Sequence, residues 1–211
     1  MEAAEAERLV QRLREQRLTT LSLAEQIKDD RWHEPALPGA VTVHETLAHL
    51  LAWDEWAVAV FEISLIRDEL PPVLQRALDD VDGFNQRART RHRGISRFDL
   101  LNGLQTANPR LITSAQASGG PEWHNRAIAG LRYPADWQMS QEPNVGGILR
   151  MLRAHESAHD KEIMAAFGIE PKLDEWRDQQ GANAGGERRS AASTASANGE
   201  SDEGAAPSPL G

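Results

Sequence analysis

The chain has 211 residues, a formal net charge of −9 and a sequence pI near 5.3. This acidic balance argues against nucleic acid as a partner, because phosphate binding needs a basic surface. There is no cysteine, which excludes disulfides, thiolate nucleophiles and cysteine-ligated zinc, so a metal site must use His, Asp or Glu.

Helical periodicity begins near the N-terminus. Apolar residues recur at helical spacing from Glu2 to about Leu18. A turn or a second short segment is expected from Ser22 to Ile27, where Ser22 followed by Glu25 matches a capping box. The Pro- and Gly-containing stretch from Trp32 to Gly39 is then expected to break the chain.

Two further helical segments follow this loop. Thr42 and Glu45 match a capping box, and the helix that they open is expected to continue to Pro71. A third helical stretch is expected from Val73 to about Arg91. The arginine-rich segment 87–93 at its end is interpreted as a solvated helix face rather than a nucleic-acid site.

The second half of the chain predicts two more helices joined by a long connection. Ser96 matches a helix start, and Pro109 is expected to kink that helix or to begin it anew. Residues 119–143 form a long segment with many Gly, Pro and aromatic residues, and connections of this length are usually functional or mobile. Asn144 is expected to cap the last helix, which ends at Gly168.

These elements predict an all-α protein, an up-and-down four-helix bundle with a disordered C-terminal tail. No segment shows the sustained period-2 alternation of a strand. The bundle domain is expected over residues 1–178. In residues 179–211, 21 of 33 residues are Gly, Ala, Ser or Pro. Such a segment buries too little apolar surface to offset the entropy of ordering, and a disordered tail is predicted.

The most informative motif is His155-Glu156-Ser157-Ala158-His159. Histidines four residues apart lie one above the other on a helix, so both imidazoles can reach one metal ion. His49, on the helix that starts near Thr42, offers a third imidazole. Two histidines on an apolar helix face, together with a third from another helix, favour a metal site over ordinary hydrogen-bonded core histidines.

Other polar residues have expected roles around this site. Glu45 lies one turn before His49 and is expected to accept a hydrogen bond that orients its imidazole. His44 is expected to face solvent or a helix end. The remaining histidines are expected at the surface, with the last kept as a reserve ligand: His33, His92 and His124.

The letters His-Glu-x-x-His also match a zincin protease, with Glu156 as general base and Glu175 as a formal third ligand. A zincin normally holds its peptide substrate on an edge strand, and this sequence predicts none. The charged residues Asp160 and Lys161 after the second histidine also depart from the zincin pattern. The protease is therefore the least favoured reading of the motif.

Three blocks in chain order resemble the DinB-like superfamily of four-helix bundles. It includes bacillithiol- and mycothiol-dependent transferases, the mycothiol-dependent maleylpyruvate isomerase N-terminal domain and colibactin self-resistance proteins of the DfsB type. The matching residues, which span most of residues 5–168, are Leu37-Pro38-Gly39 with Thr42 to Leu50 and Trp53, then Val81 to Asn85 with Ile95 to Leu100, then His155, His159 and Ile163. Ala40-Val41 depart from it, because many relatives have a tryptophan there.

The resemblance implies a metal triad of His49, His155 and His159 that holds a divalent ion (Zn, Ni, Fe or Mn). It also implies a low-molecular-weight thiol, mycothiol or bacillithiol, as co-substrate, which suits a chain without cysteine. The leading hypothesis is a metal-dependent transferase or hydrolase that acts on a small electrophile in detoxification or stress response. The alternative is a metal-free binding or self-resistance protein.

The pattern also assigns candidates around the metal. Glu156 is the candidate catalytic proton shuttle, with a surface ion pair as the competing interpretation. Three aromatic residues are expected either to line an apolar pocket beside the metal or to belong to the ordinary core: Trp53, Trp56 and Trp137. Segment 119–143 is expected to cover the mouth of the bundle. The expected partners are a small-molecule substrate and a second copy of this chain, with which it would form a homodimer. Neither nucleic acid nor membrane is expected, and the charged N-terminus predicts a cytoplasmic protein.

Overall fold

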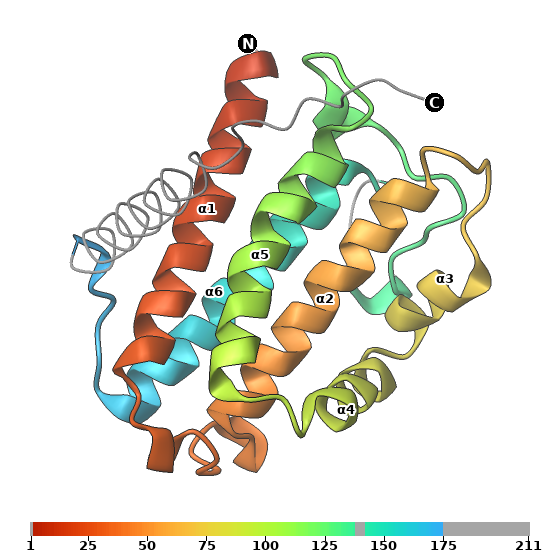
Figure 1. Cartoon of the computed structure of the whole chain (residues 1–211). Coiled ribbons are helices and arrows are strands. Elements are labelled where there is room, and N and C mark those ends of the chain that lie inside the picture. The colour runs from red at the N-terminus through yellow and green to blue at the C-terminus, as the bar shows by residue number, and fades with distance from the viewer. Residues whose placement is uncertain (1, 138–141, 175–211) are drawn as a thin grey trace, which may run out of the picture. The chain divides into compact units, whose positions relative to one another are not determined.

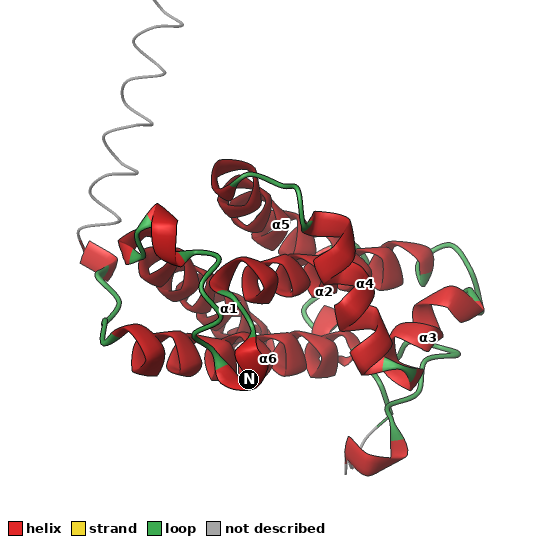
Figure 2. Cartoon of the chain, turned by 90° about the horizontal axis from the view of Figure 1, so that it is seen from below, coloured by secondary structure: helices red, strands yellow, loops and turns green. Residues whose placement is uncertain are grey.

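Helices make up the described part of the chain, which is residues 2–137 and 142–174 of the computed structural model (Figure 1). The α-helices are α1 (Glu2–Gln26), α2 (Val43–Ile63), α3 (Pro72–Asp79), α4 (Val81–His92), α5 (Arg97–Gln116) and α6 (Val145–Phe167). Short 3-10 helices are η1 (Asp29–Arg31), η2 (Pro38–Ala40), η3 (Trp123–Asn125) and η4 (Ala135–Trp137). These residues contain isolated β-bridges but no strand, which confirms the all-α class (Figure 2).

The four long helices α1, α2, α5 and α6 surround one apolar core. Helix α2 packs mainly on α5 and α1 mainly on α6, while α1 also contacts α5 and α2 also contacts α6. The shorter α3 and α4 lie against the outer side of α2 (Figure 1). The core between the helices is filled by fully buried apolar side chains, among them Phe61, Leu104, Leu111, Ile148 and Leu149.

The chain divides into two units, Met1–Pro171 and Lys172–Gly211. Only residues 172–174 of the second unit are described. The predicted domain boundary at residue 178, the predicted tail 179–211 and Glu175 therefore lie outside the described residues. Within the described residues, no helix combines the length and the apolar character that crossing a membrane requires.

Side-chain caps fix the start of both helices that carry the histidine motif. The Thr42 hydroxyl accepts a hydrogen bond from the Glu45 amide, and the Glu45 carboxylate accepts one from the Thr42 amide, each at 3.1 Å. The Asn144 side chain accepts from the Gly147 amide at 2.7 Å, and Gly168 ends α6 in the left-handed conformation. The predicted caps of both helices are confirmed.

The predicted break in the first helix is wrong. Helix α1 runs without interruption to Gln26, and Ser22 is buried inside it rather than at its start. The hydroxyl of Thr19 donates to the Glu15 carbonyl one turn earlier in the helix, and the hydroxyl of Thr20 donates to Glu156 of α6. Polar side chains just before the expected break therefore have hydrogen-bond partners while the backbone stays helical, and the capping-box match of Ser22 with Glu25 does not start a new segment.

Three other predicted helix limits also differ from the structure. Helix α2 ends at Ile63, well before Pro71, because the apolar residues after it are exposed and have no core to face, with Ile66 at 79%. The predicted third stretch is two helices, separated at Asp80, whose carboxylate caps α4. Helix α5 runs through Pro109 to Gln116, so the expected alternative of a new helix that begins at Pro109 is wrong, while the alternative of a kink there stays a prediction.

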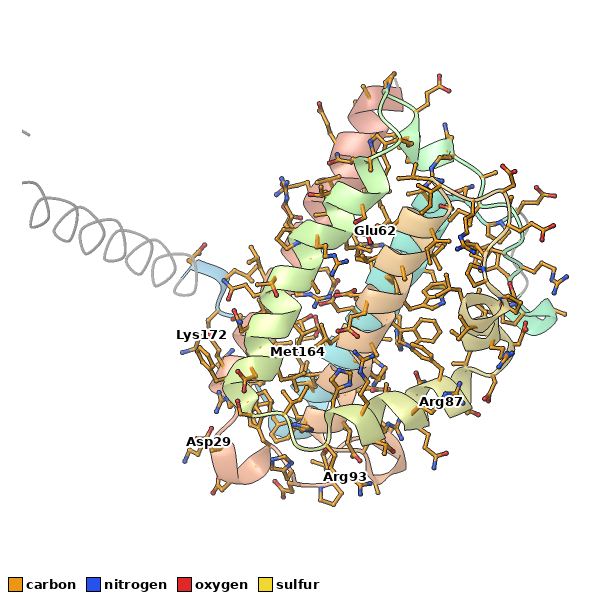
Figure 3. The ribbon with its side chains drawn as sticks, turned by 45° about the vertical axis from the view of Figure 1, so that its right-hand side comes forward. Asp29, Glu62, Arg87, Arg93, Met164 and Lys172 are labelled. Carbon is orange, nitrogen blue, oxygen red and sulfur yellow. The ribbon has the colours of Figure 1, made fainter. Side chains whose placement is uncertain are left out.

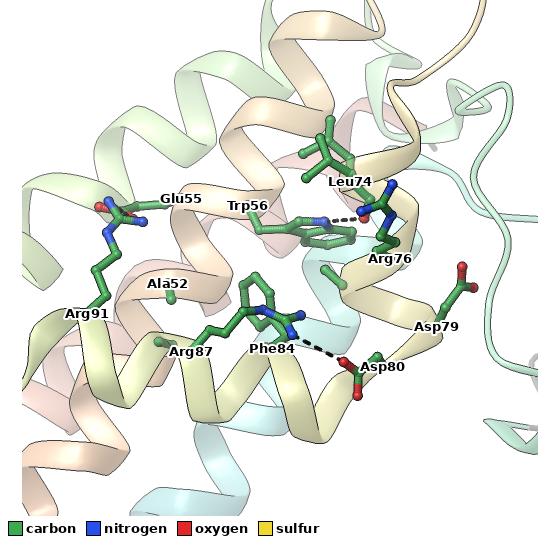
Figure 4. Close-up of a pocket in the computed structure, with 13 residues that line it drawn as sticks. Ala52, Glu55, Trp56, Leu74, Arg76, Asp79, Asp80, Phe84, Arg87 and Arg91 are labelled. Atoms are coloured by element: carbon green, nitrogen blue, oxygen red, sulfur yellow. Dashed lines mark hydrogen bonds and ion pairs between the residues drawn. The ribbon is translucent and has the colours of Figure 1, made fainter.

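Three of the four arginines in residues 87–93 lie at the surface, as predicted, while Arg89 is half-buried. Arg87, Arg91 and Arg93 are exposed. Figure 3 labels Arg87 in α4 and Arg93 at its end. Arg87 pairs with Asp80, and Arg91 pairs with Glu55 of α2 (Figure 4). These arginines form a solvated helix face rather than part of the core.

Candidate metal centre

Helices α2 and α6 bring three imidazoles to one point. His49 comes from α2, and His155 and His159 come from successive turns of α6. The Nε2 atom of His49 lies 3.3 Å from that of His155 and 3.0 Å from that of His159, and the last two are 3.1 Å apart. Among the described residues these three form a group whose ligand atoms can share a metal ion.

Hydrogen bonds determine the tautomer of two of the three imidazoles, that is, which ring nitrogen carries the proton. His49 Nδ1 donates to the carbonyl of Glu45 at 3.3 Å, and His159 Nδ1 donates to the carboxylate of Glu162 at 2.7 Å. Neither acceptor has a proton to give, so the proton must be on Nδ1 in both neutral rings. The Nε2 atoms of His49 and His159 therefore present lone pairs to each other.

The spacing of the three nitrogen atoms fits a bound cation. A tetrahedral ion with metal–nitrogen bonds of about 2.0–2.1 Å holds its ligand atoms about 3.3 Å apart, and an octahedral ion holds neighbouring ligands about 2.9 Å apart. The observed Nε2 separations, 3.0 to 3.3 Å, fall between these two values. Without a cation, facing lone pairs at such distances repel each other, so the donor set fits a metal ion better than a hydrogen-bonded core cluster.

Burial favours the uncharged form of two of these imidazoles, His49 and His155. Removal from water lowers the pKa of His49 well below its usual range, and the neighbouring His155 and His159 rings lower it further. Burial, then the proximity of His159, lowers the pKa of His155 to about 4. Neutral imidazole is the form that binds a metal ion, so this environment keeps the rings of His49 and His155 ready to act as ligands.

Sequence reasoning assigned the orientation of His49 to Glu45, and the structure corrects which atom does it. The Glu45 main-chain carbonyl accepts the Nδ1 proton, while its carboxylate is held by Thr42 in the capping box. Sequence reasoning missed Glu162, which orients His159. The available signal was its position three residues after His159, which places both side chains on one helix face.

The other histidines lie apart from the triad. His33 is exposed, as predicted. The prediction of surface positions is wrong for His92 and His124, which are each 2% exposed. His44, expected to face solvent or a helix end, is 3% exposed and lies in the first turn of α2, so only the solvent alternative is wrong. His44 contacts the Ile95 carbonyl at 2.9 Å and His92 contacts the Ala88 carbonyl at 2.9 Å, so both are core histidines with main-chain partners. His124 is not part of the metal-ligating group, although it was the reserve ligand.

Glu156 is directed toward α1. It is 4% exposed, and its carboxylate lies 2.9 Å from Arg17 Nε and accepts a hydrogen bond from the Thr20 hydroxyl at 2.7 Å. The competing interpretation, an ion pair, is present, but it is buried rather than at the surface. The catalytic role of Glu156 stays a prediction, and its contacts favour a role in holding α6 in place.

Arg17 connects all four long helices. From α1, its guanidinium contacts Glu156 of α6, donates to Asp54 of α2 at 2.7 Å and donates to the Leu104 carbonyl of α5 at 3.3 Å. Burial opposes its charge, but the carboxylates of Asp54 and Glu156 outweigh burial and raise the pKa of Arg17. The guanidinium thus fixes α2 and α6, the two helices that supply the triad, relative to each other.

The carboxyl groups beside Arg17 are held in unusual states by burial. Burial raises the pKa of Asp54 to about 6, although Arg17 acts in the opposite direction. Burial, then the nearby Glu156, raises the pKa of Asp160 to about 7, although the neighbouring Thr20, Arg17 and Gln16 side chains act in the opposite direction. Three acids around one guanidinium therefore form a buried polar layer next to the triad.

An apolar cavity of about 260 Å³ adjoins the triad, with His155 in its wall. Trp53 and Trp137 line it, as the sequence predicted, and Val81 and Met151 complete the lining. Trp56 instead lines a larger surface groove of about 600 Å³ between α2, α3 and α4 (Figure 4). Its indole Nε1 donates to the Leu74 carbonyl of α3 at 2.8 Å, which fixes the ring in the lining of that groove.

The long connection between α5 and α6 reaches this cavity. Its η3 segment packs on α6 and α5, and its η4 segment carries Trp137. Residues 138–141, within the predicted lid, lie outside the described residues. The covering role of the whole segment 119–143 stays a prediction, but Trp137 places part of it beside the triad.

Comparisons with protein-family models, with curated proteins and with solved structures each found no match to this chain. The triad geometry and its surroundings therefore carry the functional argument.

Proposed function

We propose that His49, His155 and His159 bind one divalent metal ion, and that the chain is a metal-dependent transferase or hydrolase with the four-helix bundle of the DinB-like superfamily. The observation that carries this proposal is the convergence of the three Nε2 atoms, two of which cannot carry a proton while their rings are neutral. The expected substrate is a small electrophile, in detoxification or stress response.

A divalent ion bound by three neutral imidazoles keeps most of its charge, so it would supply Lewis acidity and lower the pKa of a water or thiol at its open positions. The chain's own residues do the positioning. His49 is held by the Glu45 carbonyl and His159 by the Glu162 carboxylate, which fixes the direction of both Nε2 lone pairs.

The nucleophile in this proposal comes from outside the chain. The sequence has no cysteine, so a thiol-dependent reaction requires an added low-molecular-weight thiol such as mycothiol or bacillithiol. Water is the corresponding nucleophile if the enzyme is a hydrolase. Glu156 enters the proposal as the residue that anchors α6 to α1, since its carboxylate contacts Arg17 and Thr20.

The test is an activity screen with metal-loaded protein and small electrophiles, with and without mycothiol, bacillithiol or glutathione. The proposal predicts turnover that is lost in the His155→Ala variant and after chelation, and that returns when metal is added back. Turnover independent of any thiol would assign the hydrolase branch. Full activity after complete chelation would contradict the metal mechanism, and stoichiometric ligand binding without turnover or metal would favour the metal-free binding protein.

The remaining expectations on partners are part of the proposal. They are a small-molecule substrate, no nucleic-acid or membrane partner, a cytoplasmic location and a homodimer. The acidic net charge of −9 supports the expectation that nucleic acid is not the partner.

A further inference from the structure

The cavity beside His155 has an apolar lining. Its walls come from four separate elements: Trp53 of α2, Val81 of α4, Trp137 of η4, and Met151 with His155 of α6. None of these lining residues is an Asp, Glu, Lys or Arg. The cavity is therefore bounded on one side by His155 of the triad and on the other sides by apolar side chains.

The indole of Trp53 is fixed with its polar group already satisfied. Its Nε1 donates to the Asn85 side chain at 2.9 Å, so no free donor from this ring is left for a ligand. The ring is supported by Phe84, with centroids 4.4 Å apart, and by Trp56 at 5.3 Å. It meets His155 at right angles with the centroids 6.4 Å apart, so this aromatic surface lies next to the triad.

Trp137 lines the cavity from the side of the long connection. Its ring stacks on that of Tyr133, with centroids 6.3 Å apart. Both aromatic walls of the cavity are thus supported by a second aromatic ring. Such a wall is suited to a flat apolar group, because aromatic rings contribute a large contact area with few rotatable bonds.

We propose that this cavity binds an uncharged, apolar ring of the substrate and holds its reactive group against the triad. The inference rests on the proposed function in taking the triad as the reacting centre. An apolar cavity of about 150 Å³ is enough for a benzene ring. The volume of about 260 Å³ therefore suits one ring with a substituent or two fused rings.

The same apolar lining disfavours binding of a charged ligand group. A carboxylate or ammonium group placed between these residues would lose its hydrating water without gaining a hydrogen-bond partner. The free energy of this desolvation far exceeds the gain from apolar contacts. By contrast, the larger groove of Figure 4 carries both signs of charge at its rim, with Arg76, Arg87 and Arg91 beside Glu55, Asp79 and Asp80, and none of the three histidines lines it.

The test is a calorimetric titration with two probes that share one ring system, neutral 2-naphthylmethanol and anionic 2-naphthoate. The neutral probe is expected to bind the protein with and without chelator. In chelated protein, the anionic probe is expected to bind at least tenfold more weakly. Equal affinity of the two probes in chelated protein, or no binding of the neutral probe, would overturn the proposal.

Two matched variants locate the binding. Val81→Trp fills the cavity and is expected to weaken binding of 2-naphthylmethanol at least tenfold. Val73→Trp makes the same change in the groove of Figure 4, where Val73 is 65% exposed, and is expected to leave affinity within twofold. Far-UV circular dichroism checks folding. If Val81→Trp does not fold, the smaller Val81→Phe change must weaken binding, and unchanged affinity in it would overturn the proposal.

Metal binding, measured on the same samples, separates this inference from the proposed function. If the probe binds as expected but no metal binds at the histidines, the cavity is an apolar site and the metal proposal fails. If metal binds stoichiometrically but Val81→Trp leaves the affinity for the probe unchanged, the metal proposal stands and this inference fails.

Discussion

The Nε2 atoms of His49 and His159 lie 3.0 Å apart, while the Nδ1 atom of each ring donates to a separate acceptor. Two neutral imidazoles in this arrangement face each other with lone pairs. The contact is favourable only if a cation or an extra proton lies between them, and burial, which lowers the pKa of His49, disfavours the proton. The arrangement is typical of metal ligands whose second nitrogen is fixed by a carbonyl or a carboxylate.

Replacing Glu162 with Ala should weaken metal binding. The Glu162 carboxylate accepts the Nδ1 proton of His159 at 2.7 Å, and loss of such a partner typically costs about 10- to 100-fold in metal affinity. Competition with a chromophoric chelator measures the change. Glu7→Ala, which removes an exposed carboxylate from α1, is the control and should leave the affinity unchanged. Unchanged affinity in Glu162→Ala would show that the carboxylate does not support the ligand.

Replacing Arg17 with Met should destabilise the fold strongly. The change leaves Asp54 and Glu156 buried without their cation, and breaking a buried pair in this way costs about 3–5 kcal/mol. Urea unfolding of the metal-free protein measures the free energy of unfolding. The matched change Arg87→Met breaks the exposed pair with Asp80 and should cost less than about 1 kcal/mol. Similar losses in the two variants would mean that Arg17 does not hold the helices together.

The caps and the histidine spacing were predictable because both are local. Thr42 with Glu45, Asn144 and Gly168 act within a few residues of chain, so the limits of α6 and the start of α2 followed from sequence patterns. The pair His155 and His159 shares a face of one helix by spacing alone. That His49 lies close to this pair was a hypothesis, based on the helical pattern and on the resemblance to the DinB-like superfamily. The packing of α2 on α6 brings the three side chains together, as that hypothesis predicted.

What could not be predicted depends on contacts between distant segments. The expected break at Ser22 does not occur, and Thr20, two residues earlier in α1, donates to Glu156, 136 residues away, a contact with α6 that the local sequence does not reveal. In the sequence, Arg17 has the pattern of a surface arginine on an amphipathic helix. Its burial depends on contacts with three other helices, which the sequence does not show. His44 and His92 are buried because main-chain carbonyls satisfy them, and sequence periodicity does not reveal that.

Asp54 should make the stability of the metal-free protein depend on pH in the direction opposite to an ordinary ion-paired carboxylate. Its pKa in the folded state, about 6, lies above the usual 3.8 because the group is buried. Between these values the folded state keeps a proton that the unfolded state has lost. The contribution of Asp54 to the free energy of unfolding therefore falls as the pH rises from about 4 to about 6, and it is constant above that range.

The Asp54→Asn variant isolates this contribution. The charged groups that face Asp54 are Arg17 of α1, Glu156 of α6 and Glu55 of its own helix, and all remain in the variant. The free energy of unfolding of the wild type minus that of Asp54→Asn, measured with chelator from pH 4 to 7, should decrease up to about pH 6. A difference that stays flat or rises over this range would contradict the assignment.

Metal content of the untagged protein tests the central claim most directly. After incubation with excess zinc, nickel, iron or manganese and removal of free ion, elemental analysis should find one equivalent of at least one metal per chain. His155→Ala should retain none, while His33→Ala, which removes an exposed histidine outside the triad, should retain the full equivalent. No bound metal in the wild type, or a full equivalent in His155→Ala, would contradict the assignment of His49, His155 and His159 as the metal site.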